Sequence, residues 1–124
     1  MFTLLAGAPL AQQDEIAATI DAQIEAFRSD DLGLAFSHAS PALRRVFRNA
    51  ENFGEMVRRG YPMVLEPSDI QYLELRQKAG SLWQKVRIID ASGRAHLLDY
   101  QMVNVENRWK INAVLLLEPP VDSV

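Results

Sequence analysis

Apolar residues alternate with polar ones through residues 68–117, in four runs that short turns separate. Alternation at every second residue is the pattern of a β-strand that buries one face. The separating turns lie at residues 79–80, 90–94 and 106–107, and each contains the Gly, Asn or Asp residues that tight hairpins prefer. Strands joined by such short turns pair antiparallel. The second half of the chain is therefore predicted to be a four-stranded antiparallel meander.

The turn at residues 90–94 predicts the register of the middle hairpin. Asp90 at its start and Gly93 near its end suit a three-residue loop that closes with a glycine in the left-handed region. Such a loop places Asp90 opposite Arg94, and the two-residue period of a strand then sets every later pair. The pairs predicted to follow are Ile88–His96, Val86–Leu98, Gln84–Tyr100 and Leu82–Met102.

The turns at residues 79–80 and 106–107 predict the registers of the two outer hairpins in the same way. The pairs predicted for the first are Gln77–Leu82, Leu75–Gln84 and Leu73–Val86. Those predicted for the last are Val105–Arg108, Asn104–Trp109, Met102–Ile111, Tyr100–Ala113 and Leu98–Leu115. All three registers agree on one apolar face, and such agreement between independent signals is typical of a sequence that specifies its fold. The face is predicted to contain Leu73, Leu75, Leu82, Val86, Ile88, Leu98, Tyr100, Met102, Trp109, Ile111, Ala113, Leu115 and Leu117.

The opposite face is predicted to carry both a charge ladder and an apolar cluster. Asp99 is expected there beside Lys85, with Glu74 on the next strand. Contiguous apolar patches usually mark contact sites, so the sequence predicts a homodimer through this face. The alternative is that Lys and Arg stems or residues 1–10 cover it. The predicted contact residues are Trp83, Leu97, Val103, Val114 and Leu116, with Leu97 opposite Leu116, Asp99 opposite Val114, and Val103 opposite Lys110.

Helical spacing replaces this alternation in the first half of the chain. Ile16, Ile20 and Ile24 fall on one stripe of a helix that is predicted to start at residue 13 or 14. A polar break at residues 29–31 leads into three shorter helices with N-caps at Asp31, Ser40 and Asn49. Helices followed by an antiparallel meander predict an α+β fold, with the N-terminal helices packed on one face of a curved four-stranded sheet. The helical residues expected to face the interior are Phe27, Phe36, Phe47, Phe53 and Met56.

Length and charge restrict the class of protein. A chain of 124 residues is large enough for one domain with its own core. A net charge of -3 argues against nucleic acid as a partner, since phosphate-binding domains normally carry a basic excess. The chain has no cysteine, which excludes a disulfide framework and thiolate metal sites and says nothing of the redox compartment.

The first thirteen residues, MFTLLAGAPLAQQ, are apolar and end in small residues before a polar run. They have the features of the end of a secretory signal but lack its basic start, and they are too short to span a bilayer. We expect either a signal remnant, with a periplasmic or secreted protein, or a tail on a domain that stays in the cytoplasm. The expected organisation is a segment at residues 1–13, one domain at residues 14–118, and a tail at residues 119–124.

Two segments carry a resemblance to a known family. The stretch AFRSDDLGLAFSHASP resembles the opening of the nuclear-transport-factor-like, or cystatin-like (SnoaL-like), cone superfamily. The stretch FGEMVRRGYPMVLEP, followed by four strands, is similar to a bacterial family of domains of unknown function within it. The resemblance covers about residues 14–117 and implies a cystatin-like cone. It implies no one activity, because cone proteins include isomerases, dehydratases, epoxide hydrolases and binding modules.

The enzymes that this chain resembles use an Asp, a Tyr or a His–Asp pair inside the cone. Here the register directs His96 and Tyr100 inward and Asp99 outward, because neighbours in a strand face opposite sides. The interior acid that proton transfer needs is therefore predicted to be absent. His96 is expected to have no carboxylate partner, and Tyr100 is expected to exchange hydrogen bonds with Gln84. No catalytic residue, metal ligand or cofactor is predicted; His38 has no second ligand at metal spacing.

We therefore predict a non-catalytic module that binds a small ligand or serves in assembly. The alternative is an enzyme of the isomerase or dehydratase type that acts on a small apolar molecule, with Tyr100 and His96 as donors. Tyr61, after the helix stop at Gly60, is expected to close the mouth of a cone that is filled or nearly filled. The candidate pocket residues are Tyr61, Gln84, His96, Tyr100 and Trp109.

Five arginines lie on two successive predicted helices, with two glutamates among them. The ordinary interpretation is a solvated face with ion pairs along each helix. The alternative is a patch for an anion or an acidic partner, through which this protein would dock as a periplasmic accessory subunit. These residues are Arg44, Arg45, Arg48, Arg58 and Arg59, with Glu51 and Glu55.

Overall fold

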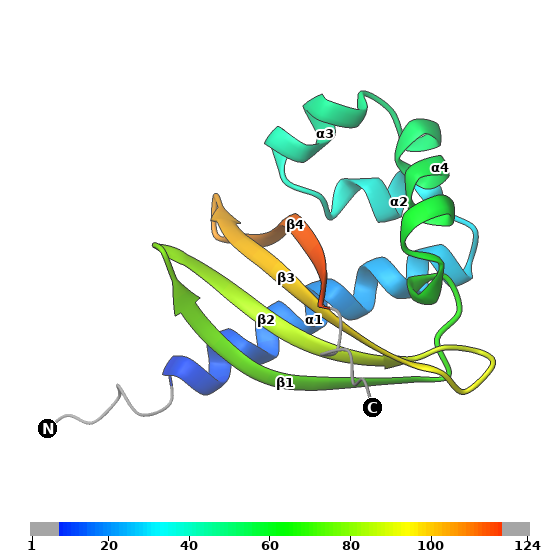
Figure 1. The fold of residues 1–124 in the computed structure, drawn as a ribbon. Coiled ribbons are helices and arrows are strands. Elements are labelled where there is room, and N and C mark those ends of the chain that lie inside the picture. Colours follow the sequence, from blue (N-terminus) through cyan, green and yellow to red (C-terminus); the bar gives the residue numbers. More distant parts are fainter. Residues whose placement is uncertain (1–7, 118–124) are drawn as a thin grey trace, which may run out of the picture.

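The computed structural model describes residues 8–117 and has four helices, a 3₁₀ turn and one sheet (Figure 1). The helices are α1 (Ala8–Arg28), α2 (Leu32–Ser37), α3 (Pro41–Phe47) and α4 (Ala50–Gly60), and the 3₁₀ turn is η2 (Pro62–Val64). The strands are β1 (Asp69–Lys78), β2 (Ser81–Ile89), β3 (Ala95–Val105) and β4 (Arg108–Leu117). They pair antiparallel in the order β1-β2-β3-β4. The predicted α+β fold, with N-terminal helices and a four-stranded meander, is confirmed.

The helix α1 lies along one face of the sheet, and α2, α3 and α4 gather beside β4 (Figure 1). The apolar stripe of α1, which contains Ile16, Ile20 and Ile24, is buried against the sheet. The helix begins at Ala8, so the predicted start at residue 13 or 14 was wrong. Ala, Leu and Gln favour a helix, and proline is tolerated in a first turn. One turn later, the side chain of Gln13 ties this end of α1 to the sheet, because its Nε2 donates to the carbonyl of Leu73 at 3.1 Å.

The predicted segments at the two ends fall partly or wholly outside the described residues. Residues 1–7 of the expected signal remnant and the expected tail at residues 119–124 lie there.

The predicted caps of the short helices are confirmed. The side-chain oxygens of Asp31, Ser40 and Asn49 each accept a hydrogen bond from the backbone N–H three residues later, at 3.1, 3.1 and 2.8 Å. Each bond satisfies one of the N–H groups that a helix start leaves unpaired. Pro41 occupies the first helical position of α3, where its missing N–H has no cost.

The middle hairpin has the predicted register. Asp90 and Arg94 are joined by a backbone hydrogen bond, Gly93 adopts a φ of 92°, and every pair from Ile88–His96 to Leu82–Met102 is confirmed. The outer hairpins also turn at the predicted places. Both central residues of each turn, Ala79-Gly80 and Glu106-Asn107, have positive φ, as the type I′ hairpin requires.

Away from these turns, a β-bulge interrupts each outer hairpin. In β1, Leu73 and Glu74 stand together opposite Lys85, since Tyr72 pairs with Val86 and Leu75 with Gln84. The predicted pair Leu73–Val86 was therefore wrong. The extra residue leaves a carbonyl outside the ladder. That carbonyl, of Leu73, accepts hydrogen bonds from the side chains of Gln13 and Gln84.

In β4 the extra residue is Asn112, because Met102 pairs with Ile111 and Gln101 with Ala113. Asn112 lies within a chain of side-chain hydrogen bonds that runs from Ser40 through Asn112 to Gln101 and on to Ser81, at 2.7, 2.8 and 3.0 Å. Nearby, residues 38–40 pair with β4 through the bridge between Ala39 and Ile111. These tertiary contacts hold Asn112 and the neighbouring backbone at the bulge.

The β4 bulge exchanges the faces of every residue that follows it. The predicted pairs Tyr100–Ala113, Leu98–Leu115, Leu97–Leu116 and Asp99–Val114 were wrong. The observed pairs are Tyr100–Val114, Leu98–Leu116, Leu97–Leu117 and Asp99–Leu115. By this register Ala113, Leu115 and Leu117 fall on the outer face with Asp99, contrary to prediction, although Ala113, directly after the bulge, still borders the cleft described below. Val114 and Leu116 face the helices with Tyr100.

Candidate functional site: an apolar cleft under α4

A cleft of about 250 Å³ lies between the helices and strands β3 and β4. Its walls come from α1, α3, α4, the segment after α4, β3 and β4. The residues that line it are Gln23, Phe27, Leu43, Phe47, Phe53, Met56, Val57, Tyr61, Val64, Tyr100, Ile111, Asn112, Ala113 and Val114. The cone is therefore not completely filled. Of the large residues predicted for the helical side, Phe36 does not line the cleft.

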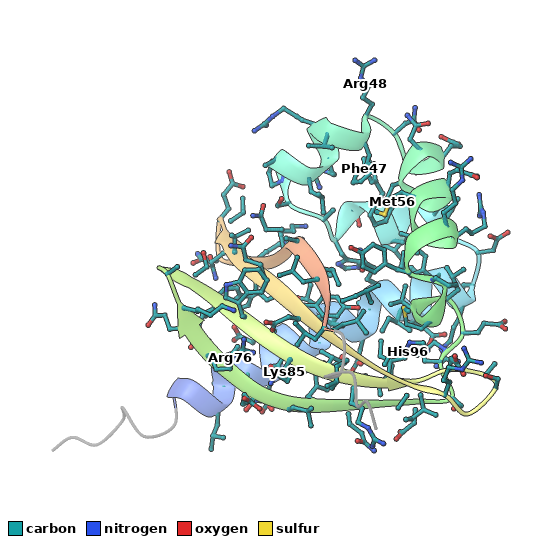
Figure 2. The ribbon with its side chains drawn as sticks, in the orientation of Figure 1. Phe47, Arg48, Met56, Arg76, Lys85 and His96 are labelled. Carbon is teal, nitrogen blue, oxygen red and sulfur yellow. The ribbon has the colours of Figure 1, made fainter. Side chains whose placement is uncertain are left out.

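A cluster of phenylalanines forms its helical wall. The ring of Phe53 lies 6.0 Å from that of Phe27, 5.4 Å from that of Phe36 and 5.8 Å from that of Phe47, measured between centroids. Contacts of this kind hold aromatic rings in fixed orientations. Figure 2 shows Phe47 and Met56 together between α3 and α4, where both line the cleft. This wall is apolar and positioned by rigid side chains.

Tyr61 is one of the residues that line the cleft. It follows Gly60 at the end of α4, and its hydroxyl donates to the carbonyl of Val114 at 2.8 Å. The accepting group is a main-chain carbonyl two residues after the bulge at Asn112. Tyr61 thus links α4 to the edge strand across the cleft.

Tyr100 forms the floor of the cleft and is 1% exposed. Its hydroxyl has no hydrogen-bond partner among residues 8–117. Burial, and then the nearby Tyr61, raise the pKa of this phenol above its ordinary value. The group therefore stays protonated at neutral pH and is available as a hydrogen-bond donor.

None of the other three predicted pocket residues, Gln84, Trp109 and His96, lines the cleft. Gln84 does not bond to Tyr100 as predicted; its Nε2 donates to the carbonyls of Leu73 and Lys85, at 3.0 and 2.8 Å. Its Oε1 is buried without a partner in the described part of the chain. Trp109 donates from Nε1 to Glu15 at 3.2 Å, which ties β4 to α1. Gln84 thus bonds within the sheet, and Trp109 joins the sheet to α1.

His96 lies in a second groove, of about 750 Å³, between the β2–β3 hairpin and η2. Its Nε2 is 2.8 Å from Oδ2 of Asp90, so the expectation of no carboxylate partner was wrong. Asp90 also accepts from Ser92 and from the backbone of Arg94. The bond to His96, followed by these bonds, holds the pKa of Asp90 well below its ordinary value. The sequence signal was present, since both residues belong to one hairpin, but Asp90 was assigned only to the turn.

Asp99 is on the outer face, as predicted, and yet it is 1% exposed. Its two oxygens accept from Arg76 in a bidentate pair, at 3.0 and 2.8 Å. The predicted partner Lys85 lies opposite in the register but bonds to Glu74 at 3.4 Å. Figure 2 shows Arg76 and Lys85 near each other on β1 and β2.

The described residues contain no group of three or more His, Cys, Asp or Glu that could hold a metal ion. In the same part of the chain, none of the helices is long and apolar enough to cross a membrane.

Comparison with protein families gives one match. The model of the family described as a domain of unknown function (DUF4864) matches residues 9–124, which is most of the chain. Neither the curated proteins nor the solved structures gave a match.

Proposed function

We propose that this chain, which belongs to the DUF4864 family of domains of unknown function, is a non-catalytic module that binds a small apolar molecule in the cleft under α4. The observation that carries the proposal is Tyr100 at the floor of an apolar cleft, because its hydroxyl forms no hydrogen bond among the described residues. Small-molecule sites use such a polar group on an apolar lining to orient the ligand. A ligand with an acceptor oxygen would pair this one.

The size and lining of the cleft define the ligand class. Its volume of about 250 Å³ exceeds that of apolar cavities of about 150 Å³ that bind benzene. Small-molecule sites typically combine an apolar lining with a few placed polar groups. The expected ligand is a compact apolar molecule with one carbonyl or ether oxygen, which accepts a hydrogen bond from Tyr100. The resemblance to cone proteins supports such a role, because that superfamily includes binding modules.

Binding is favoured over catalysis by the chemistry of the lining. The residues that line the cleft include no Asp, Glu, His, Lys or Arg. Acid–base catalysis needs a group that exchanges a proton near neutral pH within reach of the substrate. The alternative enzyme, with Tyr100 and His96 as donors, would need both on one molecule, and the two line different cavities. The pair of His96 and Asp90 is the best remaining basis for an enzyme.

The experiment uses two probes of nearly equal shape, acetophenone and ethylbenzene. Binding is followed by chemical-shift changes in amide NMR spectra. We expect both probes to shift residues around the cleft, with acetophenone bound at least threefold more tightly through its carbonyl. Leu43→Trp places a large ring in the cleft and should abolish binding of both. Leu34→Trp makes the same change at an exposed position of α2 that does not line the cleft, and it should leave both affinities unchanged.

Two results would contradict binding in this cleft. Shifts that gather around His96 and Asp90, or equal loss of binding in both tryptophan variants, would place the probes elsewhere. Turnover of a substrate that is lost in His96→Gln would favour the enzyme.

We also propose that two copies associate through the outer face of the sheet. The bulge removes Val114 and Leu116 from the predicted contact surface and adds Leu115 and Leu117, beside Leu97 and Asp99. Leu115 is 47% exposed, an unusual position for so large an apolar side chain next to other apolar residues. The revised contact residues are Trp83, Leu97, Val103, Leu115 and Leu117.

Light scattering tests this assembly. Leu115→Lys should convert a dimer into a folded monomer. Leu34→Lys, which makes the same change at a position exposed to 49% on α2, should leave the dimer intact. A wild-type monomer at high micromolar concentration would end the assembly proposal without affecting the binding proposal.

A further inference from the structure

The arginines of the two helices, which form one group in the sequence, separate into two kinds in the structure. On α4, Arg58 and Arg59 both pair with Glu55, at 3.4 and 3.2 Å. These are the ordinary ion pairs of a solvated helix face. On α3, Arg44 instead meets a cation from a distant part of the chain, Lys110 on β4.

Arg44 and Lys110 converge on one oxygen atom, the carbonyl of Ser37. Lys110 donates to it from Nζ at 2.9 Å and Arg44 from Nη1 at 3.3 Å. Ser37 is the last residue of α2, and the carbonyls at a helix end attract cations. One cation is sufficient for that purpose. The second cation brings two positive charges to one carbonyl.

The surroundings of this pair are also cationic. The pKa of Lys110 is lowered by burial, then by Arg44 and Arg108. The pKa of His38, next to Ser37, is lowered by burial and then by Lys110. Nearby positive charge produces shifts in this direction. Among the described residues, neither Arg44 nor Lys110 forms an ion pair with a carboxylate, although the whole chain has a net charge of -3.

Donor groups remain for a ligand. Lysine has three N–H donors and arginine five, and each side chain uses one on Ser37. The α2–α3 connection lies directly beside β4, so the donors come from both sides of it (Figure 1). We infer that Lys110 and Arg44 form a binding site for a phosphate group, apart from the apolar cleft.

The charge of the site favours phosphate over a carboxylate. Two cations close together match the double negative charge of a phosphate or phosphomonoester, whereas a carboxylate carries one. The guanidinium suits bidentate contact with phosphate oxygens, and the ammonium acts as a point charge.

The test is a titration of the intact protein with inorganic phosphate, and with phenyl phosphate as a monoester probe. Amide NMR spectra are recorded at constant ionic strength, with acetate as the comparison anion. We expect saturable shifts confined to residues 37–44 and 108–112, with phosphate bound at least tenfold more tightly than acetate. Tighter binding of phenyl phosphate than of inorganic phosphate would identify a monoester as the better ligand.

Two variants and a matched control assign the site to its residues. Lys110→Met keeps the apolar stem and Arg44→Gln keeps a donor; each should weaken phosphate binding at least tenfold. Arg59→Gln removes an arginine that is already paired with Glu55 and should leave the affinity unchanged. When Lys110 is replaced, Arg44 still donates to the carbonyl of Ser37, so the replacement is not expected to unfold the protein.

The wild-type titration is decisive even if a variant fails to fold. Shifts that grow linearly without saturation would overturn the inference. So would equal responses to phosphate and acetate, or shifts spread over the arginines of α4. Equal affinities of wild type and a folded Lys110→Met would overturn it as well.

Discussion

Asp99 and Tyr100 are neighbours in β3 and lie on opposite faces of the sheet. As residues they are equally buried, yet only the polar group of Asp99 has hydrogen-bond partners in the described part of the chain. Both are 1% exposed. The carboxylate of Asp99 is held by two hydrogen bonds from Arg76. The hydroxyl of Tyr100 has no partner within the described residues and faces the apolar cleft.

The difference distinguishes a structural group from a binding group. A buried charge without a partner destabilises a fold, so Asp99 needs a partner from its own chain. A phenol tolerates an unpaired hydroxyl at moderate cost, because its ring still gains from burial. Only the unpaired hydroxyl of Tyr100 remains free to form a hydrogen bond with a ligand. The predictions below test this distinction, from the largest expected effect on stability to the smallest.

Arg76→Met should have the largest effect. It leaves the buried carboxylate of Asp99 with only Lys78, at 4.0 Å. Loss of one partner of a buried pair typically costs about 3 kcal/mol or more. The thermal midpoint should therefore fall by roughly 10 °C. Lys85→Met removes a lysine that pairs with the exposed Glu74, and it should change the midpoint by a few degrees at most. Similar losses in the two variants would show that Asp99 is not specially dependent on Arg76.

Asn112→Ala should have the next largest effect. It removes the link between Ser40 and Gln101 and leaves a half-buried donor and acceptor without partners. We expect a loss of about 1–2 kcal/mol in the free energy of unfolding, measured by urea denaturation. Asn52→Ala, which loses one exposed hydrogen bond to Phe47, is the matched control and should lose less. An unchanged stability would mean that the backbone alone maintains the bulge.

These bulges mark the limit of what the sequence predicted. Turn residues determine the register of a hairpin up to the first bulge. The middle hairpin has no bulge, so its register was predicted along its whole length. Asn112 in β4 resembles any polar residue on a strand. Its role depends on Ser40, which is 72 residues away in the chain. No local pattern contains that contact, and the shift it causes moved Val114 into the candidate site.

The candidate site was predicted in part for the same reason. Tyr61 was identified because a helix stop precedes it, and Tyr100 because the middle hairpin directs it inward. His96 and Gln84 were placed on the correct face but at the wrong distance from the cleft. Strand alternation gives the face of a residue and does not give the curvature of the sheet, which separates the ends of one face into two cavities.

The pair of Asp90 and His96 offers a smaller test, in a hairpin turn that water reaches. The pKa of Asp90 is lowered in the folded protein by its bonds to His96, Ser92 and Arg94. Its contribution to stability is therefore complete above the unfolded pKa of about 3.9 and is lost as the pH falls through the lower, folded pKa. Between about pH 4 and pH 2, stability should fall more steeply in the wild type than in Asp90→Asn. Asp14→Asn, at an exposed position of α1, should keep the wild-type slope.

Tyr100→Phe should have the smallest effect on stability and a clear effect on binding. The change keeps the ring and removes a hydroxyl that no described residue bonds, so the free energy of unfolding should change by less than about 0.5 kcal/mol or should rise. The cleft should still bind ethylbenzene with the wild-type affinity. Its preference for acetophenone should disappear, because that preference requires a donor at the floor. Tyr61→Phe is the matched control: it loses the bond to Val114, which should lower stability, and it leaves the donor of Tyr100 in place. A large loss of stability in Tyr100→Phe would mean that its hydroxyl is paired within the protein, and the distinction between Tyr100 and Asp99 would no longer hold.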